Sequence, residues 1–350
     1  MKTVTVHASK QYEVRIEDGL LQKAGQQILT VSKACSAVLV SDETVFSLYG
    51  ATVQKSLQDA GFTVHTFTIK PVEASKSTAT LVKLWEFLAA CNITRSDLLI
   101  ALGGGVVGDL TGFAAATFLR GIDFVQIPTT LLAMVDSSVG GKTAVDLQHG
   151  KNLAGAFHQP SLVLCDPTAL QTLPEEIFSD GMAEVIKYGF INRPELISML
   201  ENQYDITDII TLCVEDKRDI VEQDERDNGC RQFLNLGHTL AHGIELQSDY
   251  TVSHGSAVAI GMVLITKAAI KNNLCTAETL DVLLQLLNQY NLPTETQFTC
   301  EQLFEATLED KKRKGDFITL VIPTVTGKSE LKKFAINDLP AFLIKAWDNT

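Results

Sequence analysis

Short apolar, β-branched runs alternate with helical patterns along the first half of the chain, and this alternation constrains the fold most. Five runs are predicted to be strands, at residues 36–40, 62–67, 98–102, 124–127 and 162–164. Strands separated by helical segments are typical of a parallel sheet covered by helices. We therefore expect an α/β domain with a parallel sheet, and the alternating residues 1–7 indicate a further strand.

After Pro174 the pattern changes to long amphipathic segments, which predict a mainly α-helical second half. The expected helices lie at residues 176–191, 194–227, 236–249, 255–273 and 277–290, and a late strand at 317–322. A chain of 350 residues is long enough for two cores. The predicted domains are residues 1–173 and 174–350.

Charge and composition exclude several classes of partner. The formal net charge is −13, which disfavours nucleic acid and anionic membrane surfaces because phosphate groups need a cationic face. No apolar run has the length of a membrane span, and the start is not typical of a signal peptide, so the cytoplasm is the expected location. The seven cysteines include no C-x-x-C pair and indicate neither a disulfide framework nor a thiolate metal site.

A glycine-rich segment joins the predicted strand at 98–102 to an apolar helix. Its residues are Gly103, Gly104, Gly105, Val106, Val107, Gly108 and Asp109. The pattern G-x-G-x-x-G in this context predicts a dinucleotide site, since the backbone can approach a pyrophosphate at the helix N-terminus. A tight glycine turn without a ligand is the alternative. Asp42, after an earlier strand, is a better ribose partner than Asp123, and Glu73 and Lys76 can reach the same nucleotide.

A second polar cluster extends from Thr129 and Thr130 to residue 152. Gly141-Lys142-Thr143 is similar to the end of a P-loop, but that motif needs glycine at position 136, where this chain has Asp136. Nucleoside triphosphate hydrolysis is therefore the weaker interpretation. Lys142, Lys151 and Asn152 are good anion ligands, and Asp136 can hydrogen-bond a hydroxyl or an amide. The alternative is a glycine-rich surface loop with solvated lysines.

One carboxylate and three imidazoles suggest a catalytic metal site. His238 and His242 have the i, i+4 spacing that puts both rings on one helix face, and Glu184 and His254 can complete the site through folding. The alternative is that each histidine only satisfies a polar group of the core. The nearby cations and amide favour an anionic, oxygen-rich substrate held against a metal; they are Lys187, Lys217, Arg231 and Asn235.

Several long motifs stand together over nearly the whole chain. They occupy residues 103–117, 119–121, 128–132, 135–143, 150–152, 183–189, 224–225, 234–239 and 254–255. In these motifs the chain resembles the 3-dehydroquinate synthases of the sugar-phosphate cyclase family. It departs from the usual pattern at Ser256, Ala241 and Asp146, where glutamate, glycine and asparagine are common. Ser256 can alter the surroundings of His254 and hence metal affinity.

The resemblance implies an N-terminal NAD-binding domain, a C-terminal helical domain, a cleft between them and a homodimer. It implies Glu184, His238 and His254 as zinc ligands, with cobalt a substitute metal, and His242 as a proton-handling group outside the ligand shell. The implied NAD-contacting positions are the glycine segment 103–108, Asp42, Glu73, Lys76, Asp109, Thr129, Thr130, Lys142, Lys151 and Thr172. The implied substrate-binding positions are Asp136, Lys142, Asn152, Lys187, Lys217, Arg231, Asn235, His242 and Lys312, with Lys311 an alternative to Lys312. Arg120 matches an arginine that reaches the neighbouring subunit's site.

The implied reaction converts 3-deoxy-D-arabino-heptulosonate 7-phosphate to 3-dehydroquinate and phosphate, a step of chorismate biosynthesis. NAD accepts a hydride and later returns it, so phosphate elimination and aldol closure proceed without net oxidation. Lys217 and Arg231 are the candidates for the substrate carboxylate, and the phosphate ligands are Lys142, Asn152, Asn235, Lys312 and Arg120. The alternatives are another sugar-phosphate cyclase, a metal-dependent polyol dehydrogenase that releases NADH, and a nucleotide-binding relative without activity.

Overall fold

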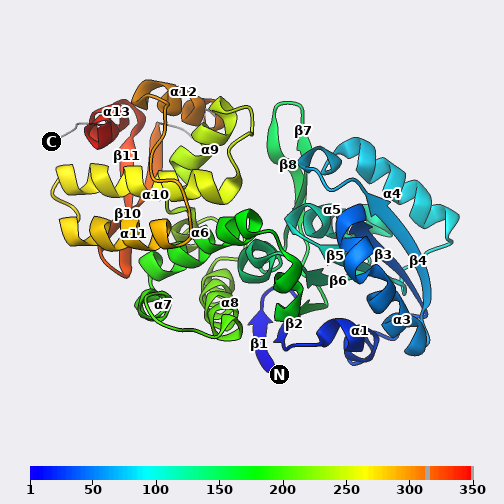
Figure 1. The fold of residues 1–350 in the computed structure, drawn as a ribbon. Coiled ribbons are helices and arrows are strands. Elements are labelled where there is room, and N and C mark those ends of the chain that lie inside the picture. Colours follow the sequence, from blue (N-terminus) through cyan, green and yellow to red (C-terminus); the bar gives the residue numbers. More distant parts are fainter. Residues whose placement is uncertain (312–315, 348–350) are drawn as a thin grey trace. The chain divides into compact units, whose positions relative to one another are not determined.

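A seven-stranded sheet in the order β1-β2-β9-β6-β5-β3-β4 forms the first part of the chain (Figure 1). The structure, a computed structural model, describes residues 1–311 and 316–347. All neighbouring strands run parallel except β1 with β2. The parallel sheet and its five predicted strands are confirmed. The strands are β1 (Lys2–His7), β2 (Gln11–Ile16), β3 (Ser36–Asp42), β4 (Thr63–Ile69), β5 (Leu98–Gly103), β6 (Asp123–Pro128) and β9 (Leu162–Cys165).

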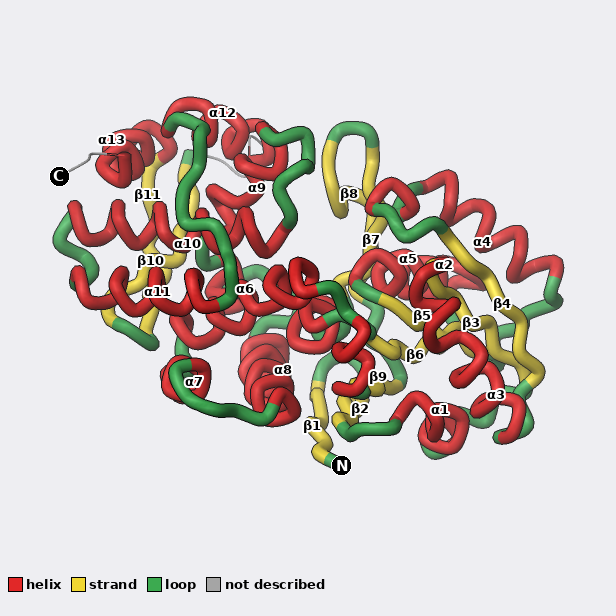
Figure 2. The backbone as a smooth tube through the Cα atoms, in the orientation of Figure 1, coloured by secondary structure: helices red, strands yellow, loops and turns green. Residues whose placement is uncertain are grey.

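Burial explains why the central strands read as continuous apolar runs. Strand β5 is buried at every position, as expected for a parallel strand covered on both faces. Helices α4 (Thr78–Ala90) and α5 (Gly105–Thr117) share one core cluster with the sheet, which includes Val38, Leu84, Leu99, Leu110 and Phe124. Figure 2 shows these helices, with α1 (Leu20–Leu29) and α3 (Ala51–Asp59), alongside the strands.

The chain divides into two compact units, and the first is not continuous in sequence. It comprises Met1–Pro174 together with Ile206–Arg226, and the second comprises Glu175–Asp205 and the chain from Asp227 onward. Helix α8 (Ile206–Gln223) therefore follows the proposed boundary at residues 173/174 in sequence but packs with the first unit, on β1 and β2. Within the described residues, no helix is long and apolar enough to span a membrane.

The second unit is mainly helical, as predicted. Helix α10 (His254–Lys271) is its central element and packs against α6 (Glu175–Ile191), α9 (His238–Gln247), α11 (Ala277–Gln289) and β10 (Phe317–Val325). Strand β10 pairs with β11 (Lys328–Ala335) in a hairpin, of which the sequence predicted the first strand only. Helices α12 (Cys300–Lys311) and α13 (Leu339–Leu343) complete the unit.

The single helix predicted at residues 194–227 is wrong, because the structure has two. Helix α7 (Pro194–Leu200) ends where the Gln289 side chain donates a hydrogen bond to the Leu200 carbonyl. Tyr204, in the connection to α8, lies 3.1 Å from the Tyr290 hydroxyl. The Gln289 bond satisfies a carbonyl at the end of α7, and both contacts are made by residues at the end of α11, so the chain turns even though the apolar pattern continues.

Residues 142–157 form a β-hairpin, so the alternative of a glycine-rich surface loop is wrong for them. Strand β7 (Lys142–Leu147) pairs antiparallel with β8 (Gly150–Phe157). Side chains of β8 are exposed or half-buried at every position, so no alternation of apolar and polar residues marks it. The preceding residues form a π-helical turn, η4 (Ala133–Ser137).

Glu225 connects three separate segments of the first unit. Its carboxylate accepts hydrogen bonds from the Ser9 amide at 2.9 Å, the Ser9 hydroxyl at 2.6 Å and Gln159 Nε2 at 2.8 Å. Burial raises the pKa of Glu225, but the hydrogen bonds from Ser9 and Gln159 lower it more, and the net pKa is below its usual value.

Glu225→Gln is therefore expected to lower stability at neutral pH by about 1 kcal/mol, a figure reduced for solvent screening. A carboxyl group with a lowered folded-state pKa stabilises the fold above its unfolded pKa, and this stability is lost as pH falls through the folded pKa. Urea unfolding of both proteins from pH 7 to pH 3 should show a difference that shrinks in acid. A difference that is constant over this range would contradict the assignment.

Candidate functional site

The predicted nucleotide residues lie at the carboxyl ends of adjacent parallel strands. Strand β3 leads to β4 on one side, whereas β5 leads to β6 on the other, so the order of strands reverses between β3 and β5. Ligands of open α/β sheets bind at such a switch point. Asp42 ends β3 and Gly103 ends β5, and Thr129, after β6, donates its amide hydrogen to the Gly103 carbonyl at 3.0 Å.

The glycine segment forms the turn from β5 into α5, as predicted. Gly104 is the N-cap of α5 and offers no capping side chain, so the helix terminus keeps its positive end for an anion. A Cβ at Gly105 would lie 3.2 Å from Ser137 Oγ, and one at Gly108 would lie 2.6 Å from Gln126 Oε1. Glycine at these positions thus keeps the approach to the helix start open and lets α5 pack on the sheet. These features fit a bound pyrophosphate.

Lys76 contacts two other predicted site residues, Asp109 and Asn152. Its ammonium lies 2.5 Å from Asp109 Oδ2 on α5 and donates a hydrogen bond to Asn152 Oδ1 at 2.5 Å. Asn152 has φ 57°, and its amide donates to Asp146 Oδ1 at 2.8 Å. Burial lowers the pKa of Lys76, but Asp109 and the nearby carboxylates raise it more, so the ammonium stays charged. A buried positive charge is therefore held between residues predicted to contact the nucleotide and a residue predicted to contact the substrate.

Four further predicted residues of the first unit surround the same edge of the sheet. Lys217 on α8 donates to the Asp136 carbonyl at 2.5 Å and lies 3.0 Å from its Oδ1. Thr172 follows β9 and lies 2.5 Å from the Tyr49 hydroxyl. Burial raises the pKa of Glu73, which follows β4. Asp136, Thr172 and Glu73 follow the carboxyl ends of β6, β9 and β4, and Lys217 contacts Asp136.

The second unit brings Glu184, His238 and His254 together from three helices, α6, α9 and α10. Their ligand atoms all lie within 4.8 Å of one another. His238 Nε2 is 3.5 Å and His254 Nε2 is 3.4 Å from the same carboxylate oxygen, Glu184 Oε1. One carboxylate and two imidazoles are a donor set that zinc accepts in catalytic sites, with a position left for substrate. The residues present therefore fit a zinc ion.

Polar partners of the Nδ1 atoms orient both imidazoles toward Glu184. His238 Nδ1 lies 3.1 Å from the Leu236 carbonyl oxygen, so Nδ1 carries the proton and Nε2 keeps its lone pair. His254 Nδ1 lies 3.6 Å from Glu245 Oε1. Such partners fix the tautomer and orientation of metal-binding histidines. Sequence reasoning missed Glu245, although it follows His238 by seven residues and so lies on the same helix face.

The charges of this cluster favour a cation. Burial lowers the pKa of His238 to about 3, so this imidazole is neutral and can donate a lone pair. Burial also lowers the pKa of His254, but hydrogen bonds with Glu184 and Glu245 raise it more, to about 10. The carboxylates of Glu184 and Glu245 thus favour a positive charge beside them, and a metal ion can supply it in place of a proton.

Lys187 pairs with Glu184 one turn earlier on α6, and both side chains are buried. Arg231 is buried in the 3-10 helix η6 (Cys230–Asn235), and the His242 ring lies edge-on to His238 with centroids 5.9 Å apart.

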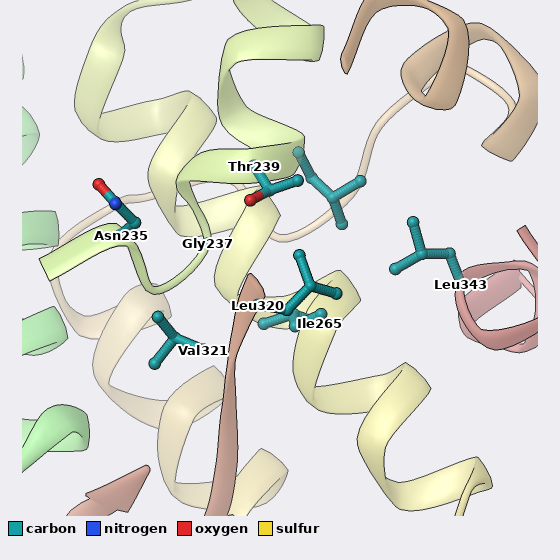
Figure 3. A pocket seen from close by; sticks show the side chains of 8 residues that line it. Asn235, Gly237, Thr239, Ile265, Leu320, Val321 and Leu343 are labelled. Atoms are coloured by element: carbon teal, nitrogen blue, oxygen red, sulfur yellow. The ribbon is translucent and has the colours of Figure 1, made fainter. Parts of the chain in front are cut away.

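Asn235 lines a small cavity, but its amide points away from the aliphatic side chains that form the other wall (Figure 3). This apolar cavity does not include the metal-binding cluster among its lining residues.

Within its described residues, the structure shows no site contact for two further predicted residues, Arg120 and Lys312. Arg120 lies in the 3-10 helix η3 (Phe118–Arg120), where it is exposed and has φ 70°. Lys312 lies outside the described residues, and the choice between it and Lys311 stays open.

Comparison with known proteins finds the same protein family over both halves of the chain. Residues 66–180 match the model of the 3-dehydroquinate synthase N-terminal family, and residues 181–313 match that of the C-terminal family. The 3-dehydroquinate synthases of Clostridium kluyveri and Enterococcus faecalis are each 42% identical to this chain, and each match covers 98% of both sequences.

Solved structures share the fold. A 2-epi-5-epi-valiolone synthase from Streptomyces hygroscopicus with NAD+ and Zn2+ bound has a TM-score of 0.88 at 25% identity, over 98% of this chain and 99% of that one. A 2-deoxy-scyllo-inosose synthase complexed with carbaglucose-6-phosphate, NAD+ and Co2+ has a TM-score of 0.87 at 22% identity, over 98% and 100%. A probable glycerol dehydrogenase from Sinorhizobium meliloti shares the fold more distantly, with a TM-score of 0.62. From its motifs, its architecture and its curated relatives, the chain belongs to the 3-dehydroquinate synthase family.

Proposed function

We propose that the protein converts 3-deoxy-D-arabino-heptulosonate 7-phosphate to 3-dehydroquinate and inorganic phosphate, the second step of chorismate biosynthesis. The observation that carries the proposal is the cluster of Glu184, His238 and His254 in a chain 42% identical to curated 3-dehydroquinate synthases. The family's reaction needs a metal site and a dinucleotide site, and the chain has residues that suit both.

The proposed cofactors are NAD, at the turn between β5 and α5, and zinc or cobalt, held by Glu184, His238 and His254. When bound, NAD takes up and returns a hydride, and the metal polarises substrate hydroxyls as a Lewis acid. The two related cyclase structures described above contain NAD+ together with Zn2+ or Co2+, which supports this pair of cofactors.

The chain's own residues bind and orient the substrate in this proposal. Lys217 and Arg231 are buried cations suited to a carboxylate, and arginine can bind one with two parallel hydrogen bonds. His242 is exposed and its ring lies edge-on to His238, and in this proposal it holds a proton near the departing phosphate. The proposed phosphate ligands are Lys142, Asn152, Asn235, Lys312 and Arg120.

Two other functions share parts of this description. Another sugar-phosphate cyclase would keep the same metal and NAD residues, and a polyol dehydrogenase would share the fold. The curated relatives at 42% identity favour dehydroquinate synthesis over both, because the two cyclases and the glycerol dehydrogenase compared above are 14–25% identical to this chain.

Phosphate release from 3-deoxy-D-arabino-heptulosonate 7-phosphate tests the proposal. The purified protein is supplied with catalytic NAD and with zinc, either present or removed by a chelator, while absorbance follows NADH. Many phosphates released per NAD, lost on chelation and without NADH accumulation, are expected. Accumulation of NADH with a polyol would favour the dehydrogenase, and release from a different sugar phosphate alone would favour another cyclase.

Assembly as a homodimer in the cytoplasm stays a prediction. Leu147, Leu153 and Phe157 on the β7–β8 hairpin are apolar and more than 40% exposed, which supports a partner surface on this hairpin. Light scattering of the purified protein should give twice the monomer mass of 38.2 kDa. A monomer mass at micromolar concentration would contradict it.

A further inference from the structure

The helix that carries His254 is capped by a residue of another helix. Helix α10 begins at His254, and the side chain of its N-cap residue, Ser253, makes no capping hydrogen bond. The Ser256 amide in the first turn instead donates to Asp180 Oδ1 at 3.1 Å, and the Ser253 hydroxyl donates to the same oxygen at 2.5 Å. The hydroxyl oxygens of Ser253 and Ser256 lie 2.8 Å apart. Asp180 thus satisfies the Ser256 amide, a first-turn donor that the side chain of the N-cap residue normally satisfies, and it also holds the Ser253 hydroxyl.

The backbones of α6 and α10 meet at the same point. A Cβ at Gly255 would overlap the carbonyl oxygen of Asp180, so only glycine permits this approach. Asp180 precedes Glu184 by four residues on α6, and the two side chains therefore share a helix face. The contact between Asp180 and the start of α10 consequently sets where His254 lies relative to Glu184.

His238 is held by different contacts. The Leu236 carbonyl orients the His238 ring. Gly237, the residue before His238, has φ 79° and packs against backbone atoms of Val258 and Met262 in the middle of α10. Loss of the Asp180 contact therefore affects the placement of His254 more than that of His238. The second orienting partner of His254, Glu245, comes from α9 and acts on the ring only.

We propose that Asp180 is a positioning residue for metal binding, which fixes His254 against Glu184 through its hydrogen bonds to Ser253 and Ser256. The proposal rests on the proposed function, because it concerns the metal site of that function. Partners that orient metal ligands typically change metal affinity by about 10- to 100-fold when they are lost.

Zinc affinity of the metal-free protein, measured by competition with a chelating indicator, tests the proposal. Asp180→Ala should raise the Kd for zinc by about 10- to 100-fold. Asp180→Asn should recover most of the affinity, because its amide oxygen can accept the same hydrogen bonds. Ser253→Ala removes one of the two hydrogen bonds and should raise the Kd by roughly 3- to 10-fold. Glu278→Ala is the matched control, because Glu278 is exposed in the first turn of α11 in the same unit.

The outcomes separate positioning from a purely structural role. If Asp180→Ala is folded and binds zinc within about two-fold of wild type, the proposal is overturned. If that variant does not fold, Ser253→Ala decides between the same two results. His238→Ala serves as the reference for the metal site itself, since it should lose zinc whether or not Asp180 matters. Zinc binding by His238→Ala at wild-type affinity would overturn the proposed metal site and the role of Asp180 together. If His238→Ala loses zinc but the Asp180 and Ser253 variants bind it like the wild type, only the role of Asp180 is overturned.

Discussion

Replacing His238 with alanine is expected to reduce phosphate release by at least roughly 1,000-fold, well beyond the ~10- to 100-fold typical for an outer partner of a metal ligand. The reason is the ligand count: with Glu184 and His254 alone, a zinc ion would keep two of its three protein ligands. The folded protein should persist, because His238 lies in the first turn of α9 and alanine favours helix formation there.

Three measurements on the same sample check this prediction: phosphate release, bound zinc by atomic absorption, and thermal unfolding by circular dichroism. His7→Ala is the control, since His7 is an exposed histidine at the end of β1. Turnover and zinc content near those of the wild type in the His238 variant would contradict the metal assignment. A loss of folded protein of the same size as the loss of turnover would leave no separate effect on the metal and would also contradict it.

The sequence predicts those elements whose burial pattern is local. Strands such as β5 are apolar at every position because both faces are covered, and helix α10 starts and ends within two residues of its predicted range. The hairpin β7–β8 was not predicted, because β8 has no fully buried face to produce an alternating pattern. The break between α7 and α8 was missed because Gln289 and Tyr290, far away in sequence, create it.

In the candidate site, too, local motifs could be predicted from the sequence but contacts between distant residues could not. Residue types and motifs were enough to predict Glu184, His238 and His254, which the structure brings together. Asp180 and Glu245 were not predicted. Asp180 matters only because α6 and α10 approach closely at Gly255, and no local pattern encodes such a contact between helices.

Lys76→Met is expected to lower the stability of the protein by about 3–5 kcal/mol at pH 7, the usual effect of removing one partner of a buried ion pair. The side chains of Lys76 and Asp109 are 6% and 17% exposed, and their charged atoms lie 2.5 Å apart. Burial raises the pKa of Asp109, and the Lys76 charge opposes this rise. Without Lys76, the Asp109 carboxylate would be buried with its main compensating charge removed. Binding of NAD should weaken as well, because Asp109 and Asn152 would lose the group that holds them in place.

The pH dependence distinguishes this loss from a packing defect. A carboxyl group whose folded-state pKa is raised costs least stability below its unfolded pKa and progressively more as pH rises through the folded pKa. The deficit of Lys76→Met should therefore be larger at pH 8 than at pH 4.5 in urea unfolding. The double variant Lys76→Met/Asp109→Asn should regain most of the stability, because both charges are then absent, and Lys70→Met, at an exposed lysine in the same segment, should be close to wild type. A deficit that is independent of pH and persists in the double variant would mean that the stem of Lys76, and not its charge, stabilises this part of the first unit.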